Sequence, residues 1–179
     1  GVLNVGSLSV LTPTKSKFNN FLEAYNSDNL ASFVYGGENY KALITDSNGN
    51  VVINGRILAR DEVNIFGNNI KIGNGTDKAG IIAGVKNQDT NFRSVDLAKQ
   101  TFDSLVSNNI KDTNSFALKD GKIKIIANNS SKFSEDAGDV KTSVDIKKAD
   151  IGANDIEISS KAEIDRQERI DLADRKSVV

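Results

Sequence analysis

The sequence predicts an all-β chain that coils into stacked rungs, with two short α-helical insertions. Short apolar–x–apolar units such as Val63-Asn64-Ile65 and Ile123-Lys124-Ile125 recur along it, and alternation is the period of a strand with one buried face. Gly and Asn separate the units, and both tolerate the positive φ of tight corners. The pattern at Ile146 returns at Ile164 after about twenty residues, the length of one three-sided coil.

Composition limits the classes of function. The chain has 179 residues and a net charge of −1, and we interpret 1–179 as one domain. This balance gives no electrostatic argument for nucleic acid as a partner, and no apolar run is long enough for a transmembrane segment. Because Gly1–Val5 already has strand character, we expect a mature segment or a fragment of a larger protein.

Four residue types, Cys, His, Met and Trp, are absent. Thiol nucleophiles, Cys/His zinc sites and Ser-His-Asp triads are therefore excluded. The lack of Cys has two interpretations that composition leaves open. The chain is threaded unfolded through a narrow pore, where a periplasmic disulfide would block passage, or it is an ordinary domain that happens to lack Cys.

The first elements are a strand over Leu3–Leu11 and a helix over 13–26. Thr12 can cap this helix, and Pro13 suits its first turn. Apolar residues then recur at helical spacing and are expected to pack against a sheet: Phe18, Phe21, Leu22 and Tyr25.

The segment Phe33–Tyr40 is ambiguous, and the next two segments are expected to pair as a hairpin. Lys41–Thr45 and Asn50–Asn54 flank Asn48-Gly49, which is a strong tight-turn signal. In the rungs that follow, the side chains expected to point inward are Ile53, Ile57, Ala59, Val63, Ile65, Ile70 and Ile72. Those expected to point outward are Arg56, Arg60, Asp61, Glu62 and Lys71. Phe66 is expected outside or at a corner.

A second helix is expected over 94–108, with Ser94 as its cap, and it should lie along the outside of the coil. The apolar face of this helix consists of Val95, Ala98, Phe102, Leu105 and Val106. Strand character resumes over Phe116–Ala127, with a turn at Asp120-Gly121. After a polar loop, the rungs continue through Val144, Ile146, Ile151, Ile156, Ile158, Ala162, Ile164, Ile170 and Leu172.

Two segments resemble ligand-binding loops, but a structural role, a corner or a hairpin turn, explains each of them better. Gly73–Gly80 lacks the Gly-Lys-Ser/Thr ending and the following helix of a phosphate loop, so we interpret it as a rung corner. Asp46–Asn50 lacks the later ligands of a calcium loop, so the hairpin interpretation is preferred.

Charged clusters give no candidate chemistry either. An acidic patch in a segment expected to be an exposed loop contains Glu135, Asp136, Asp139 and Asp145. The mixed charges of Lys147–Asp150 and Lys161–Glu163 are typical of a solvated outer face. We therefore predict no catalytic, cofactor-binding or metal-ligating residue, no cofactor, and no enzymatic activity.

Several segments together resemble the secretion domain of two-partner-secretion exoproteins, the filamentous haemagglutinin-type adhesins and haemolysins. The family's strand that leads into Thr-Pro corresponds to Gly1–Pro13. Its Gly-x-Val-x-Ile-x-Gly segment corresponds to Gly49–Gly55, and its Val/Ile/Ala-rich rung to Leu58–Ile65. The variant with a Phe-rich helical insertion is most similar to leukotoxin-type filamentous adhesins of Gram-negative anaerobes. The resemblance covers Gly1–Gly84 well and the remainder only as generic rungs.

The resemblance implies a right-handed parallel β-helix that is secreted through the periplasm and outer membrane. It implies one partner, an outer-membrane transporter whose periplasmic domains recognise the unfolded chain, and outer faces that contact host cells in a virulence function. Two other interpretations stay open. One is a β-helix carbohydrate-active enzyme, a polysaccharide lyase or hydrolase. The other is a structural protein that self-assembles through open coil ends.

Overall fold

The computed structural model describes residues 2–33, 37–45, 49–76, 78–85, 95–107, 118–127, 142–160, 163–166, 169–171 and 177–178. The helical elements are α1 (Lys15–Asn26), the 3-10 turn η1 (Leu30–Phe33), α2 (Glu38–Thr45) and α3 (Val95–Ser107). The strands are β1 (Val2–Val10), β2 (Asn50–Ile53), β3 (Arg56–Gly67), β4 (Asn69–Ile72), β5 (Ala79–Ala83), β6 (Lys122–Ala127), β7 (Ser143–Ile146), β8 (Ala149–Gly152), β9 (Asp155–Ser160), β10 (Glu163–Arg166), β11 (Arg169–Asp171) and β12 (Ser177–Val178).

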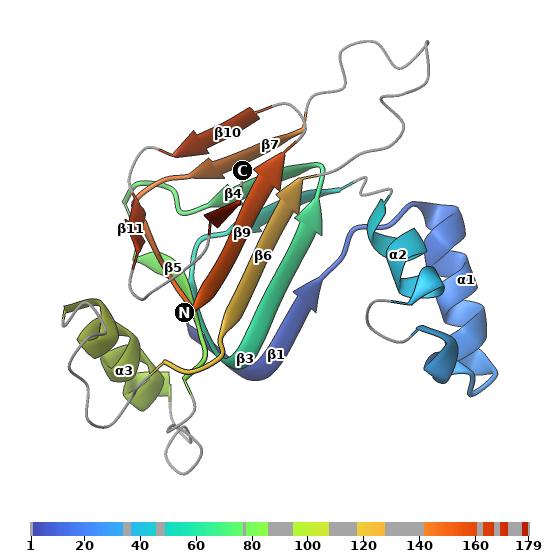
Figure 1. Ribbon diagram of the computed structural model, residues 1–179, viewed down its shortest axis with the longest axis horizontal. Coiled ribbons are helices and arrows are strands. Elements are labelled where there is room, and N and C mark those ends of the chain that lie inside the picture. The colour runs from blue at the N-terminus through green and yellow to red at the C-terminus, as the bar shows by residue number, and fades with distance from the viewer. Residues whose placement is uncertain are drawn as a thin grey trace.

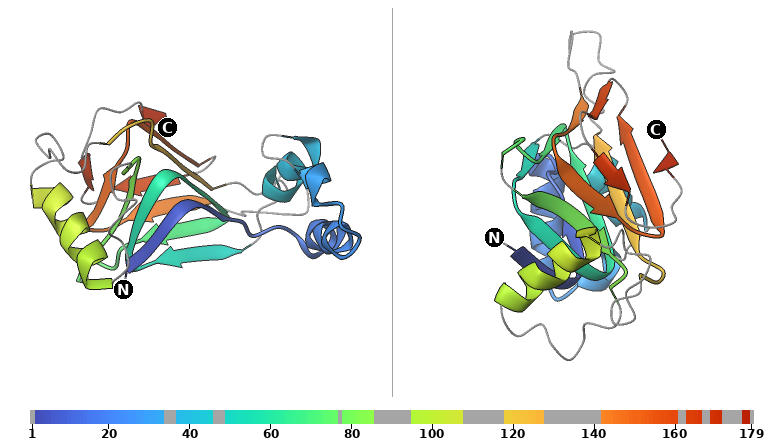
Figure 2. Two further views of the ribbon diagram at one scale, coloured as in Figure 1. Left: turned by 90° about the horizontal axis from the view of Figure 1, so that it is seen from below. Right: turned by 90° about the vertical axis from the view of Figure 1, so that its left-hand side faces the viewer.

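These strands form two parallel sheets (Figure 1). The larger has eight strands, in the order β11-β8-β5-β3-β6-β9-β12 with β1 also on β3. The smaller has four, in the order β10-β7-β4-β2. The first part of β3 pairs with β5 and its last part with β6. The larger sheet therefore curls into a half-barrel beside the smaller sheet (Figure 2).

The predicted fold class, an all-β right-handed three-sided parallel β-helix, is wrong. Of the described residues 28% are helical and 49% lie in strands, so the structure belongs to a mixed class. The physical reason lies in β3, where Arg60 and Asp61 are both exposed at the place where a coil would turn a corner. The strand nevertheless continues from Arg56 to Gly67, so that two expected faces belong to one curled sheet.

The core lies between the two sheets and is aliphatic. Side chains in register across the strands stack on one another, as Ile53, Ile72 and Ile146 do on the smaller sheet. The residues predicted to point inward are confirmed: Ile57, Ala59, Val63, Ile65, Ile70 and Ile72 are buried, and Ile53 packs against their cluster.

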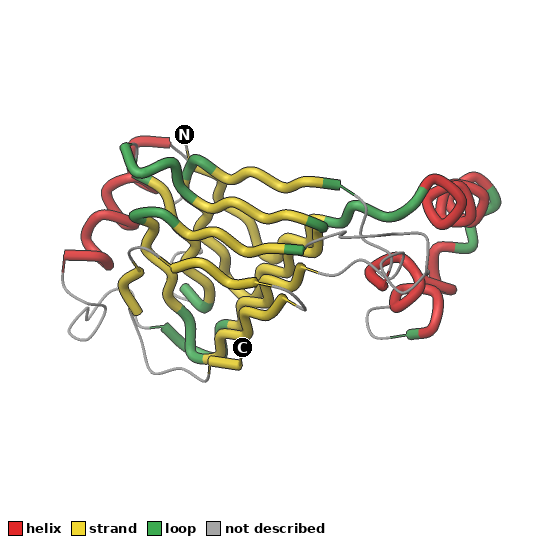
Figure 3. Tube along the Cα trace, turned by 90° about the horizontal axis from the view of Figure 1, so that it is seen from above, coloured by secondary structure: helices red, strands yellow, loops and turns green. Residues whose placement is uncertain are grey.

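Helices α1 and α2, with η1 between them, project from one end of the sheets (Figure 3). The helix predicted over 13–26 is confirmed as α1, although Thr14 rather than Thr12 occupies its N-cap. The prediction that its apolar face packs against a sheet is wrong. Phe21 makes an edge-on contact with Phe33, with ring centroids 5.3 Å apart, while Phe18 and Tyr25 are exposed. The helix packs instead on η1 and α2.

The predicted hairpin about Asn48-Gly49 is wrong. Lys41–Thr45 lies in α2, and β2 pairs in parallel with β4 rather than with the segment before it. The apolar run from Ala42 to Ile44 is too short to distinguish a strand from a helix. In α2 it places Leu43 in a buried position, with 5% of its surface exposed.

Helix α3 confirms the second predicted helix and covers the outer side of β3 and β5. Leu58, Ile82, Phe102 and Leu105 form a second apolar cluster there. A side chain at Gly80 would place its Cβ 2.6 Å from Cζ of Phe102, so the ring fits only because the strand carries a glycine at this point. The position of α3 therefore depends on the fit of the Phe102 ring over Gly80.

Candidate functional site

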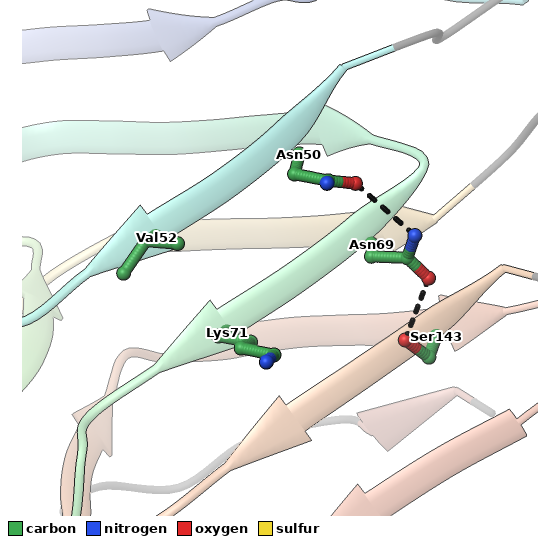
Figure 4. A pocket seen from close by; sticks show the side chains of 5 residues that line it. All are labelled: Asn50, Val52, Asn69, Lys71 and Ser143. Atoms are coloured by element: carbon green, nitrogen blue, oxygen red, sulfur yellow. Dashed lines mark hydrogen bonds between the residues drawn. The ribbon is translucent and has the colours of Figure 1, made fainter.

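Three polar side chains are linked across the outer face of the smaller sheet. Asn50, Asn69 and Ser143 begin β2, β4 and β7 and are in register. Asn69 Nδ2 donates to Asn50 Oδ1 at 3.1 Å, and Ser143 Oγ donates to Asn69 Oδ1 at 2.9 Å (Figure 4). We call this chain of side-chain hydrogen bonds the amide ladder. It crosses three strands whose residues are far apart in sequence.

A second row beside the amide ladder completes a shallow groove of about 360 Å³ (Figure 4). Val52 is 59% exposed, and Lys71 lies next to it in register and is also exposed. The groove thus offers amide and hydroxyl groups, an ammonium group and one apolar side chain. Such a surface can hydrogen-bond a polar partner and attract a negative charge on it.

Asp145 continues the second row on β7, in register with Lys71. Its Oδ2 lies 3.5 Å from Nζ of Lys147, whereas its Oδ1 is buried without a hydrogen-bond partner. The prediction that Asp145 belongs to an exposed loop is wrong, because it is a strand residue whose side chain is 20% exposed. The other members of the predicted acidic patch, Glu135, Asp136 and Asp139, lie outside the described residues.

A second groove, of about 410 Å³, surrounds the predicted turn at Asp120-Gly121. Asp120 has a positive φ of 56°, and Asn154 Oδ1 accepts a hydrogen bond from the Gly121 N–H at 3.1 Å. The amide of Asn154 therefore holds the turn in place. Asp120 and Asp155 line the groove but are both exposed.

The end of β1 forms a junction with two other segments. Thr12 Oγ1 donates to the Phe66 carbonyl at 3.3 Å and lies 3.5 Å from that of Gly49. The Asn68 N–H donates to the same Gly49 carbonyl at 2.8 Å. A Cβ added to Gly49 would lie 2.9 Å from Cβ of Thr12, so this close approach requires glycine.

The first part of the Gly-rich segment Gly73–Gly80 connects β4 to β5, which agrees with its interpretation as a corner, whereas Ala79 and Gly80 already belong to β5. Gly73 has a φ of +83°, and a side chain there would collide with the Lys147 carbonyl. Asn74 Oδ1 accepts hydrogen bonds from the backbone N–H and the hydroxyl of Thr76, at 2.9 and 3.0 Å. These contacts stabilise the connection itself.

The other predicted segments have mixed outcomes. Of the calcium-loop candidate, Asp46, Ser47 and Asn48 lie outside the described residues. Lys147–Asp150 is only partly a solvated face, since Ala149 is 1% exposed, and the side chains of Lys161–Glu163 are not described. Within the described ranges no cluster of three or more carboxylates could hold a metal ion. The described helices include none with the length and apolar character needed to cross a membrane.

The sequence contains a signal for the amide ladder that the alternation alone does not reveal. A polar residue precedes each of three similar units, Asn50-Val-x-Ile, Asn69-Ile-x-Ile and Ser143-Val-x-Ile. Aligning the units by their apolar residues would have placed the polar residues in one row. Comparisons with protein-family models, curated proteins and solved structures find no match to the chain.

Proposed function

We propose that this chain is a non-enzymatic segment of a secreted two-partner-secretion exoprotein, an adhesin or leukotoxin. One observation carries the proposal: the segments that resemble the family's secretion domain lie together. β1 pairs with β3 along its length, and Thr12 joins them to Gly49. The described parts of these segments thus belong to one contiguous unit, although they are separated in sequence: Val2–Pro13, Gly49–Gly55 and Leu58–Ile65.

The order of strand pairing supports folding after export. From β3 onward, every strand pairs with at least one strand that precedes it in the chain. A chain that emerges amino-end first can therefore form each ladder as the next strand arrives, as in proteins built from neighbour contacts. The free energy released outside the membrane then opposes backward movement.

In this proposal the partner is an outer-membrane transporter whose periplasmic domains bind the unfolded chain. The groove beside the amide ladder is the surface offered to host cells. Its exposed Lys71 and the ladder's amides can bind polar or anionic groups, which cell surfaces carry.

The test is export of the full precursor in cells that contain the transporter. Deleting Gly1–Gly84 should abolish secretion, because that segment carries the recognition. The intact precursor in cells without the transporter is the control and should also stay inside. Unchanged export of the deleted precursor would refute the proposal.

A further inference from the structure

Strand β1 lies at the border of the larger sheet, and one of its edges has no partner among the described strands (Figure 1). Among the described strands it pairs only with β3. Natural edge strands are usually short or protected by charged residues or proline. β1 has nine residues, VLNVGSLSV, with neither, and at 3.3 Å per residue it spans about 30 Å. It is therefore suited to accept another strand.

The side of β1 that faces the core is incompletely covered. Leu3, Val5, Leu8 and Val10 are in register with core residues of β3 and form one apolar row. Leu3 is 45% exposed, and the other three are only partly buried against the core. Adding a strand at this edge would remove more of this apolar surface from water.

The sequence of β1 is self-complementary. When it is read in both directions from the boundary between Gly6 and Ser7, Leu3 corresponds to Val10, Val5 to Leu8, and Asn4 to Ser9. The register shift of the strand also lies between Val5 and Ser7. That irregularity lets Val5 and Leu8, three residues apart, face the same side.

We infer that a second copy of this chain pairs antiparallel with β1 across a twofold axis between Gly6 and Ser7. In this register apolar residues oppose apolar ones on the core side, and Asn4 opposes Ser9 on the outer side. A twofold interface requires such a self-complementary patch. The absence of charge on β1 means that no like charges are brought together. The result is one continuous sheet across two molecules.

Sedimentation equilibrium of the full chain across a dilution series tests the association. We expect a species of twice the chain mass that dissociates on dilution. Leu3→Lys places a charge at the edge and should shift the protein to monomer. Tyr25→Lys introduces the same charge at an exposed site on α1, 59% exposed, and should leave the dimer intact. A wild-type chain that is monomeric throughout, with the edge free or occupied by another protein's strand, would overturn the inference.

Disulfide trapping tests the register, and the chain has no Cys of its own to interfere. Asn4→Cys with Ser9→Cys should give a covalent dimer on oxidation, because each new Cys lies opposite the other on the second copy. Within one strand the two positions are about 16 Å apart, beyond the ~7 Å Cα separation that a disulfide spans. Asn4→Cys alone is the matched control and should give much less dimer, because in this register the two copies of position 4 lie about 16 Å apart along the paired strands. Equal crosslinking of the double and the single variant would overturn the proposed register.

Discussion

At the scale of single residues, the amide ladder depends on Asn69. Its side chain makes both hydrogen bonds of the ladder, one to Asn50 and one from Ser143. Each such bond contributes about 0.5–1.5 kcal/mol to stability. We therefore expect Asn69→Ala to lower the free energy of unfolding by about 1–3 kcal/mol, measured by chemical denaturation.

A double-mutant cycle separates the ladder from general effects of amide removal. Asn50→Ala and Asn69→Ala should be non-additive by about 0.5 kcal/mol or more, because they share a hydrogen bond. Asn54→Ala, at an exposed position after β2, is the control and should change stability by less than about 0.5 kcal/mol. Strict additivity of the first pair would contradict the role of the ladder.

Alternation predicts which side of a strand a residue occupies, but not what covers that side. The inward residues, such as Val63 and Ile65, were predictable for this reason. Arg56 was expected to point into solvent, yet its side chain is only 11% exposed, because Asp103 of α3 lies 3.1 Å from it. Phe66, expected outside or at a corner, is 4% exposed. For Arg56 the covering element is α3, and its position cannot be predicted from the alternation of the strand itself.

At the scale of elements, the packing of α3 on β3 and β5 depends on Phe102. The ring is 1% exposed and fills the space above Gly80. Truncating a buried Phe costs about 3–5 kcal/mol, so Phe102→Ala should destabilise the protein by that amount. Amide hydrogen exchange should accelerate first in α3, while the strands stay protected.

The control for this variant is Tyr25→Ala on α1, which removes an aromatic ring that is 59% exposed. It should change stability by less than about 0.5 kcal/mol. If Phe102→Ala were equally mild, α3 would not depend on the packing of this ring.

The two helices with clear 3.6-residue periodicity could be predicted, whereas α2 and the continuity of β3 could not. In α2 the apolar run is too short to show a period. In β3 the consecutive exposed residues Arg60 and Asp61 have the pattern of a corner. The part of β3 before these residues pairs with β5 and the part after them with β6, and β1 pairs with both parts. The pairing with β1 keeps the strand continuous, and that pairing is a tertiary property.

At the scale of the whole molecule, the proposal of a non-enzymatic segment has a direct test. The groove at Asp120 is lined by two carboxylates that are both exposed, whereas glycoside hydrolysis needs two carboxyl groups held at a fixed separation on either side of the bond that is cleaved. Incubation with acidic oligosaccharides should leave their length distribution unchanged in chromatography. Shortening that is lost in Asp120→Asn would instead favour the carbohydrate-active interpretation.

The candidate groove also belongs to this scale, because its residues meet only in the assembled sheet. Asn50 and Asn69 are 19 positions apart, and Asn69 and Ser143 are 74 apart. The second interval contains α3, so no constant repeat length connects the three. Local patterning therefore predicts the strands, and only their register places the ladder.

The pairing of each strand with an earlier one has a mechanical consequence. Tension applied to the carboxyl end would load β12, β11 and β10 first. Among the described strands each of them pairs with a single neighbour: β12 with β9, β11 with β8, and β10 with β7. Their ladders would open bond by bond, as in a zipper, rather than resist together in shear. Pulled from that end, the molecule would yield in small successive steps and keep its amino-terminal strands folded until last.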